Sequence, residues 1–103
     1  MFIEVFTTTD KREDAEKIAK ILLEKRLSAC VQISEINSYY WWKGKIENSK
    51  EFLCIIKTKK ELYEEVEKEI KNIHPYEIPE IISIEIFKGN ENYFKWMEKE
   101  IKK

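Results

Sequence analysis

The sequence predicts an α+β fold, in which two helices cover one face of a four-stranded antiparallel sheet. Strand-like and helical segments alternate in the order strand, helix, strand, strand, helix, strand, and a short helix ends the chain. Two successive strand–helix–strand units with right-handed crossovers place both helices on the same face of the sheet. This is the ferredoxin-like arrangement, and the 103 residues fit it as a single domain, 1–103.

The chain opens on a strand followed by a helix. Residues 2–9 are β-branched and aromatic and are apolar at alternate and intervening positions, which is typical of a central strand covered on both faces. Asp10 followed by Glu13 resembles a capping box, so we expect a helix from about Lys11 to Leu27. Its apolar residues recur at helical spacing: Ala15, Ile18, Ala19 and Leu22.

Residues 29–42 and 45–58 are two strand-like segments joined at Lys43 and Gly44, which predicts a β-hairpin. Pairing across this turn opposes residues whose numbers sum to about 87.

The hairpin register separates the two cysteines. Cys54 faces Ile33, which lies an odd number of positions from Cys30, so the thiols point to opposite faces and lie too far apart for a disulfide. Their spacing also fits no zinc motif. We expect each to be a small buried apolar residue.

The second half repeats the pattern. Residues 61–73 form a helix whose apolar stripe consists of Leu62, Val66, Ile70 and Ile73. His74 and Pro75 end it, because the residue before proline avoids the α region. Residues 81–87 form the fourth strand, and Asn90 caps a last helix. The apolar side of that helix carries Tyr93, Phe94, Met97 and Ile101.

Four aromatic residues close the first hairpin strand: Tyr39, Tyr40, Trp41 and Trp42. A helix of about 17 residues covers roughly 25 Å, whereas hairpin arms of about 13 residues reach roughly 43 Å. The aromatic end therefore projects beyond the helices of its own subunit, and a projecting two-stranded ribbon is marginal in water. We expect these rings to be covered by other copies of the chain.

Two alternatives compete with this interpretation. The tryptophans Trp41 and Trp42 fold back into the core around a bulge, or the rings form a stacking platform for bases. The second lacks the basic surroundings that nucleic acid requires.

Charge and composition narrow the functional classes. The 19 basic and 20 acidic residues give a net charge of -1, which argues against nucleic-acid partners and against a polybasic membrane-surface protein. We see no membrane-spanning run and no signal-peptide pattern, so we expect a cytoplasmic protein. The Lys- and Glu-rich surface, with Ile as the leading aliphatic residue, suits a thermostable protein with ion-pair networks, although genome composition also produces it.

Few residues suggest chemistry. His74 is the only histidine; it either binds a metal ion or proton, or caps the preceding helix. The basic run that begins at Lys57 either attracts an anion or is a solvated helix start. An acylphosphatase-like protein of the same topology would have an anion-binding loop with an arginine after the first strand. The only arginine in that loop here is Arg12, so this alternative is weakly supported. No phosphate-binding glycine loop or nucleophile–base pair stands out, so we expect no enzymatic activity.

Several stretches in this order and spacing resemble the CutA divalent-cation tolerance family: EKRLSACV, YYWWKGKIE, IKTKKEL, HPYEIPEI and NYFKWM. The resemblance covers nearly the whole chain. It implies a ferredoxin-like subunit related in fold to PII signalling proteins, a tight homotrimer assembled through extended strands, a cytoplasmic location and a link to tolerance of heavy metals, notably copper.

The resemblance is weaker at the copper site proposed for some bacterial members. That site has a cysteine at the end of the first strand and a pair of histidines before Pro-Tyr. These positions are Phe6 and Ile73 here, and only His74 matches. A single imidazole is an incomplete site for a soft or borderline cation.

We therefore predict a non-enzymatic homotrimer that binds copper, another divalent cation or a small molecule in clefts between subunits. His74 and Glu77 are the candidate metal ligands, and Tyr76, Cys30 and Lys57 are expected to line the clefts. The alternatives are a PII-like module that senses a small metabolite and acts on a protein partner, and a purely structural trimer.

Overall fold

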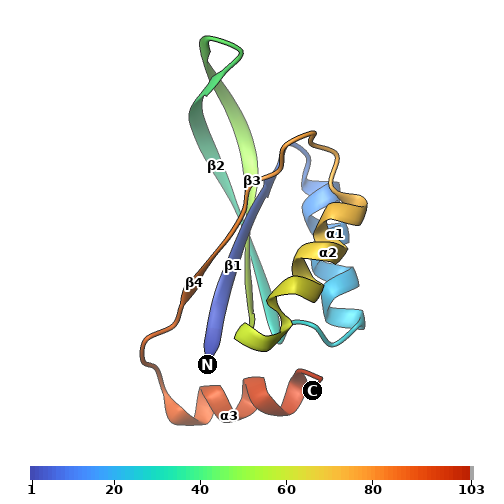
Figure 1. Cartoon of the computed structure of the whole chain (residues 1–103), viewed down its shortest axis with the longest axis vertical. Helices are drawn as coiled ribbons and strands as arrows, with labels where there is room; N and C mark the ends of the chain where they lie inside the picture. The colour runs from blue at the N-terminus through green and yellow to red at the C-terminus, as the bar shows by residue number, and fades with distance from the viewer. Residues whose placement is uncertain (103) are drawn as a thin grey trace.

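The computed structural model describes residues 1–102, and its elements follow the predicted order (Figure 1). They are β1 (Phe2–Thr9), α1 (Arg12–Glu24), β2 (Cys30–Trp42), β3 (Lys45–Lys59), a 3-10 turn η1 (Lys60–Leu62), α2 (Tyr63–Ile73), β4 (Ile81–Glu85) and α3 (Glu91–Glu100). Among the described residues, no helix is both long and apolar enough to cross a membrane.

The four strands form one antiparallel sheet in the order β2-β3-β1-β4. Helices α1 and α2 lie together on one face of it, and α3 crosses its lower end (Figure 1). The predicted ferredoxin-like fold is confirmed. Alternate residues of β1 and β3 point under the helices and are fully buried, among them Val5, Cys54 and Ile56.

The opposite face, which we call the open face, is not covered by α1 or α2. Strand alternation and the register place several apolar side chains on it, among them Phe6, Leu53, Ile55, Ile82 and Ile84. Ile82 and Ile84 keep about half of their surface exposed (53% and 52%). Edge strand β4 therefore offers apolar side chains that its own helices do not cover.

The hairpin projects as predicted. β2 and β3 pair from Cys30↔Lys57 to Trp42↔Lys45 without a bulge, and their turn extends past both helices (Figure 1). The turn needs positive φ at two positions, 50° at Lys43 and 80° at Gly44, and this is the type I′ geometry that matches the strand twist.

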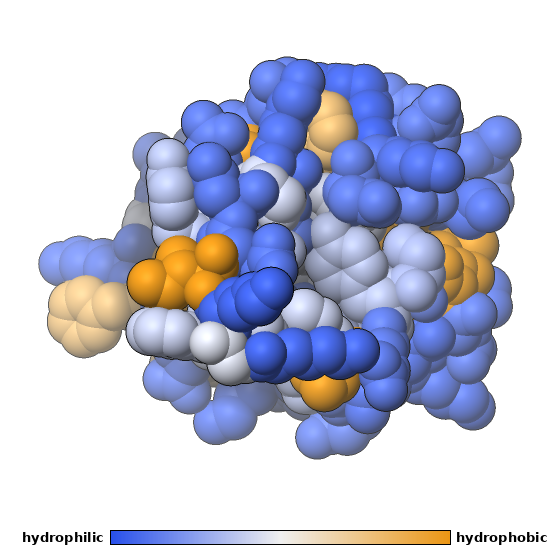
Figure 2. All heavy atoms as spheres, turned by 90° about the horizontal axis from the view of Figure 1, so that it is seen from above, coloured by the Kyte–Doolittle hydropathy of each residue, from blue (hydrophilic) through white to orange (hydrophobic). Residues whose placement is uncertain are grey.

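The alternative in which the tryptophans fold back into the core is wrong. Trp41 is 72% exposed and Trp42 is 39% exposed, because the continuous register keeps both on the projecting ribbon. Seen from this end, the molecule is mostly hydrophilic, with separate hydrophobic patches between charged side chains (Figure 2).

The boundaries of the first helix differ from the prediction. The N-cap residue is Lys11, and no side chain caps the helix, so the expected Asp10 capping box does not form. The helix ends at Glu24 and not at Leu27. Arg26 adopts a left-handed φ of 58°, and the amide of Leu27 donates to the carbonyl of Leu22 at 2.9 Å, which is the Schellman termination.

Two later boundaries also shift. The second helical segment begins with the 3-10 turn η1 and becomes α-helical at Tyr63. The fourth strand ends at Glu85, two residues before the predicted end; only the Ile86 amide continues the pairing, by donating to the Phe2 carbonyl at 2.9 Å. Phe87 lies beyond the sheet and is 94% exposed.

The last helix confirms its predicted cap and most of its apolar side. Met97 and Ile101 are buried and Phe94 packs against the core, whereas Tyr93 is 38% exposed. The Asn90 side chain accepts a hydrogen bond from the Tyr93 amide at 3.0 Å.

This cap can be tested. Asn90→Ala should lower the free energy of unfolding by about 1 kcal/mol, because the Tyr93 amide loses its acceptor. Asn90→Asp is the matched control, since aspartate also caps helices and should retain most of that stability. Urea unfolding measures both variants; equal stability of Asn90→Ala and the unaltered chain would contradict the role of the cap.

Candidate functional site

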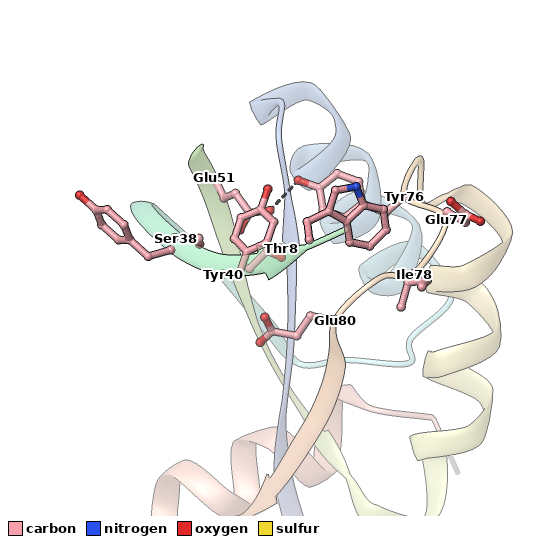
Figure 3. A pocket seen from close by; sticks show the side chains of 10 residues that line it. Thr8, Ser38, Tyr40, Glu51, Tyr76, Glu77, Ile78 and Glu80 are labelled. Carbon is pink, nitrogen blue, oxygen red and sulfur yellow. Dashed lines mark hydrogen bonds between the residues drawn. The ribbon is translucent and has the colours of Figure 1, made fainter. Parts of the chain in front are cut away.

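A cavity of about 540 Å³ lies beside the hairpin, between the strands and the segment 76–80 (Figure 3). Its lining residues come from β1, β2, β3 and that segment: Thr8, Ser38, Tyr39, Tyr40, Trp42, Glu51, Tyr76, Glu77, Ile78 and Glu80. A volume of this size falls in the range of small-molecule sites.

Strand alternation builds the hairpin wall. Ser38, Tyr40 and Trp42 lie two residues apart on β2 and share one side of the ribbon. Glu51 is paired with Ile36 in the register and therefore points to the same side. The opposite wall, residues 76–80, has no regular structure because Pro75 and Pro79 keep it from continuing α2.

Glu51 and Tyr76 connect the two walls. The Tyr76 hydroxyl donates to Glu51 Oε2 at 2.6 Å, a short hydrogen bond typical of a carboxylate acceptor (Figure 3). Glu51 is only 6% exposed. Burial raises the pKa of Tyr76 above its usual value, and the hydrogen bond to the Glu51 carboxylate and its negative charge raise that pKa further.

Tyr76 therefore lines a cavity of the protomer, its place in a cleft between subunits stays a prediction, and its partner was not expected from the sequence. Glu51 lies in a strand-forming run, and a carboxylate in such a run is ordinarily solvent-exposed. The only local signal is the hairpin register, which places Glu51 on the same side as Tyr40 and Trp42.

His74 occupies the C-cap position of α2, and backbone groups bind both of its ring nitrogens. The Tyr76 amide donates to Nδ1 at 3.1 Å, so Nδ1 accepts and Nε2 carries the proton that it donates to the Thr8 carbonyl at 2.8 Å. Burial lowers the pKa of His74, while the Thr8 hydrogen bond and nearby carboxylates oppose that shift. The imidazole thus fastens the segment after α2 to the end of β1, and its ring does not bind the last helix carbonyls.

The described part of one protomer does not contain a complete metal site. Among residues 1–102, no three His, Cys, Asp or Glu side chains are placed to hold an ion together. The Nδ1 lone pair of His74 already accepts from the Tyr76 amide, and Glu77 is exposed at the cavity. The role of His74 and Glu77 as metal ligands stays a prediction that requires groups from outside the protomer.

The other predicted cleft residues lie elsewhere. Cys30 and Lys57 are directly paired near the far end of the hairpin, and the Lys57 ammonium lies 5.6 Å from the Tyr93 ring centroid. They do not line the cavity that contains Tyr76.

The two cysteines are free and differ in their surroundings. Cys54 is fully buried, and burial raises the pKa of its thiol to about 11, which confirms the prediction of an inert apolar residue there. Cys30 is half-buried.

The comparison with known proteins gives the family. Residues 3–100 match the family model of the CutA1 divalent ion tolerance protein. The chain belongs to this family. The divalent-cation tolerance protein CutA of Pyrococcus horikoshii is 48% identical over 101 residues, which span 98% of this chain and 99% of that relative.

Other CutA proteins extend the comparison. A solved structure of a protein described as the periplasmic divalent cation tolerance protein CutA from Archaeoglobus fulgidus has a TM-score of 0.96 and 42% identity, with 99% of this chain and 100% of that chain covered. The chloroplastic protein CutA 1 of rice, Oryza sativa subsp. japonica, is 36% identical over 97 residues, or 93% of this chain and 55% of the rice protein.

The His74 contacts predict a pH-dependent contribution to stability. Because the folded pKa of His74 is lowered, the folded chain resists a proton that the unfolded chain takes up below about pH 6.5. The stability that His74 contributes should be fully present above that pH and lost as pH falls, by at most about 1.4 kcal/mol per pH unit.

The measurement is the free energy of unfolding of the unaltered chain and of His74→Ala between pH 8 and 5, roughly spanning the ordinary histidine pKa. The gap between the two proteins should narrow as pH falls. Parallel profiles would show that the imidazole is not held neutral.

Proposed function

We propose that this chain is a non-enzymatic divalent-cation tolerance protein of the cytoplasm that acts as a homotrimer and binds a divalent cation or small molecule in clefts between subunits. The observation that carries the proposal is the full-length match to the CutA1 family, with relatives such as the Pyrococcus horikoshii protein bearing the divalent-cation tolerance name.

Uncovered apolar surface supports the assembly. Tyr39 and Trp41, both 72% exposed, lie on one side of the projecting ribbon, and the open face adds Ile82 and Ile84. Exposed apolar side chains and an unprotected edge strand are typical of surfaces that another chain covers. We infer that other copies of the chain cover them, through extended strands.

The aromatic residues of the predicted interface divide between two roles. Tyr39 and Trp41 are the most exposed and suit contacts with other subunits. Tyr40 and Trp42, 41% and 39% exposed, line the cavity on the other side of the ribbon. A subunit that packs across the ribbon would close this cavity into a cleft.

Assembly also supplies what the protomer lacks for metal binding. Copper generally needs several nitrogen or sulfur ligands. We propose that His74 and Glu77 contribute to such a site together with side chains of other subunits, after the Tyr76 amide releases Nδ1.

The non-enzymatic role and the location have separate support. Backbone groups engage both nitrogens of His74, and the Cys54 thiol is buried with a raised pKa, so neither is poised as a base or nucleophile. Two free cysteines suit the reducing cytoplasm. The relatives described as periplasmic and chloroplastic belong to other compartments, so location varies within the family.

The metabolite-sensing alternative is less favoured, because the relatives that match over the full length are named for divalent-cation tolerance.

The assembly is tested by sedimentation. The unaltered chain should sediment at three times its 12.5 kDa protomer mass at micromolar concentration. Trp41→Glu should shift it toward smaller species, since it places a charge at an apolar contact. Lys20→Glu, at an exposed position of α1, is the matched control and should leave the mass unchanged. A stable folded monomer of the unaltered chain would end the trimer proposal.

The metal role is tested by calorimetry with Cu²⁺. His74→Ala removes the single imidazole and should weaken Cu²⁺ binding by about tenfold or more. Lys71→Ala, one turn earlier on α2, is the control. The titration is made where circular dichroism shows both variants folded. Identical binding before and after the histidine change would discard His74 as a ligand.

A further inference from the structure

The buried carboxylate of Glu51 has no cationic partner among the described residues. The ion pairs between described side chains do not include Glu51, Glu77 or Glu80. None of the ten described residues that line the cavity is basic, and three are acidic. The cavity is therefore an acidic one, with its most deeply buried charge at Glu51.

An uncompensated buried carboxylate is unfavourable. Moving an ionised carboxylate out of water costs several times more free energy than a single hydrogen bond returns. Tyr76 satisfies Oε2 of Glu51 but brings no charge. A cation that compensates the ionised carboxylate would have to come from outside residues 1–102 of this protomer.

The walls of the cavity indicate which cation fits. Tyr40, Trp42 and Tyr76 supply aromatic rings, and Ile78 adds an aliphatic side chain. Aromatic faces attract cations and pack against apolar groups, and cages of aromatic rings with acidic residues recognise ammonium groups. The cavity of about 540 Å³ is far larger than a metal ion, and among the described residues no three His, Cys, Asp or Glu side chains are placed to hold an ion together.

We propose that this cavity binds a small organic ammonium ion. Glu51, held by Tyr76, is its counter-ion; Tyr40 and Trp42 pack around the ammonium and its apolar body; Glu77 and Glu80 at the rim attract it from solvent. The proposal rests on the proposed function, because it names the ligand class of the cleft, but it differs in assigning the cleft to an organic cation.

The positions of the cavity side chains assign each of them a different role in binding the ammonium ion. In Figure 3, Tyr76 and Glu51 meet across the cavity, Tyr40 lies beside them, and Glu80 approaches from below. The hydrogen bond to Tyr76 fixes one carboxylate oxygen, so the remaining acceptor positions of Glu51 are directed by a rigid support. A neutral ligand of the same shape would leave this carboxylate uncompensated.

The test is calorimetric titration of the assembled protein with benzylammonium chloride, with benzyl alcohol as the neutral ligand of matched shape and magnesium chloride as the metal arm. Benzylammonium should bind at least about tenfold more tightly than benzyl alcohol, and magnesium should not compete with it. Glu51→Gln should remove most of that preference, because glutamine still accepts from Tyr76 but carries no charge.

Glu47→Gln is the matched control: it lies on the same strand, outside the cavity lining, and should bind benzylammonium like the unaltered chain. The comparison of charged and neutral ligands needs no variant, so the proposal stays testable if Glu51→Gln fails to fold.

Three results would overturn the proposal. They are equal affinity for benzylammonium and benzyl alcohol, unchanged benzylammonium affinity in folded Glu51→Gln, and failure of the unaltered protein to bind benzylammonium. In the last case, loss of the trimer on Glu51→Gln substitution would assign the counter-ion to a basic residue of another subunit. Trimer mass and Cu²⁺ binding of the unaltered chain are measured separately, so failure of the ammonium site does not count against the proposed function.

Discussion

The length difference between the hairpin and the helices determines most of what is distinctive about this molecule. β2 and α1 both contain 13 residues, but an extended residue advances more than twice as far as a helical one. Helices in this fold therefore cover only the part of the ribbon next to β1. Beside the remaining part lies the segment 76–80, and a cavity forms where the two meet.

The alternation of side chains then gives the two sides of the ribbon different surroundings. The rings of Tyr39 and Trp41 lie on the opposite side of the ribbon from those of Tyr40 and Trp42 and stay largely exposed. Tyr40 and Trp42 line the cavity, and Tyr39 borders it. A run of four aromatic residues is thus two pairs with separate surroundings. The same alternation places Glu51 beneath the second pair, where the Tyr76 hydroxyl removes it from solvent.

Local patterns were sufficient to predict the elements, the hairpin register and the Asn90 cap, because each depends on neighbours in sequence. The predictions failed where contacts between residues far apart in the sequence determine the local structure. The Asp10 capping box and the Leu27 helix end were wrong. Leu27 turns away from α1 to join the core, so burial overrode the periodic pattern. The candidate site depends on still longer separations: His74 binds Thr8, 66 positions earlier, and Tyr76 binds Glu51, 25 positions earlier. Nothing local indicates either pair.

Cleft occupancy and assembly are linked in such a molecule. A ligand that binds a cleft completed by another subunit binds the trimer and not the separated chains, so it stabilises the trimer by mass action. The burial of Glu51 destabilises the empty cavity, because an ionised carboxylate without a cation nearby is unfavourable out of water. Under the proposals above, occupancy by a cation would remove that cost and consolidate the subunit contacts. The proposed trimer would then respond to cations through the stability of its assembly, and such a response would need neither a catalytic group nor a complete set of metal ligands among the described residues of one chain.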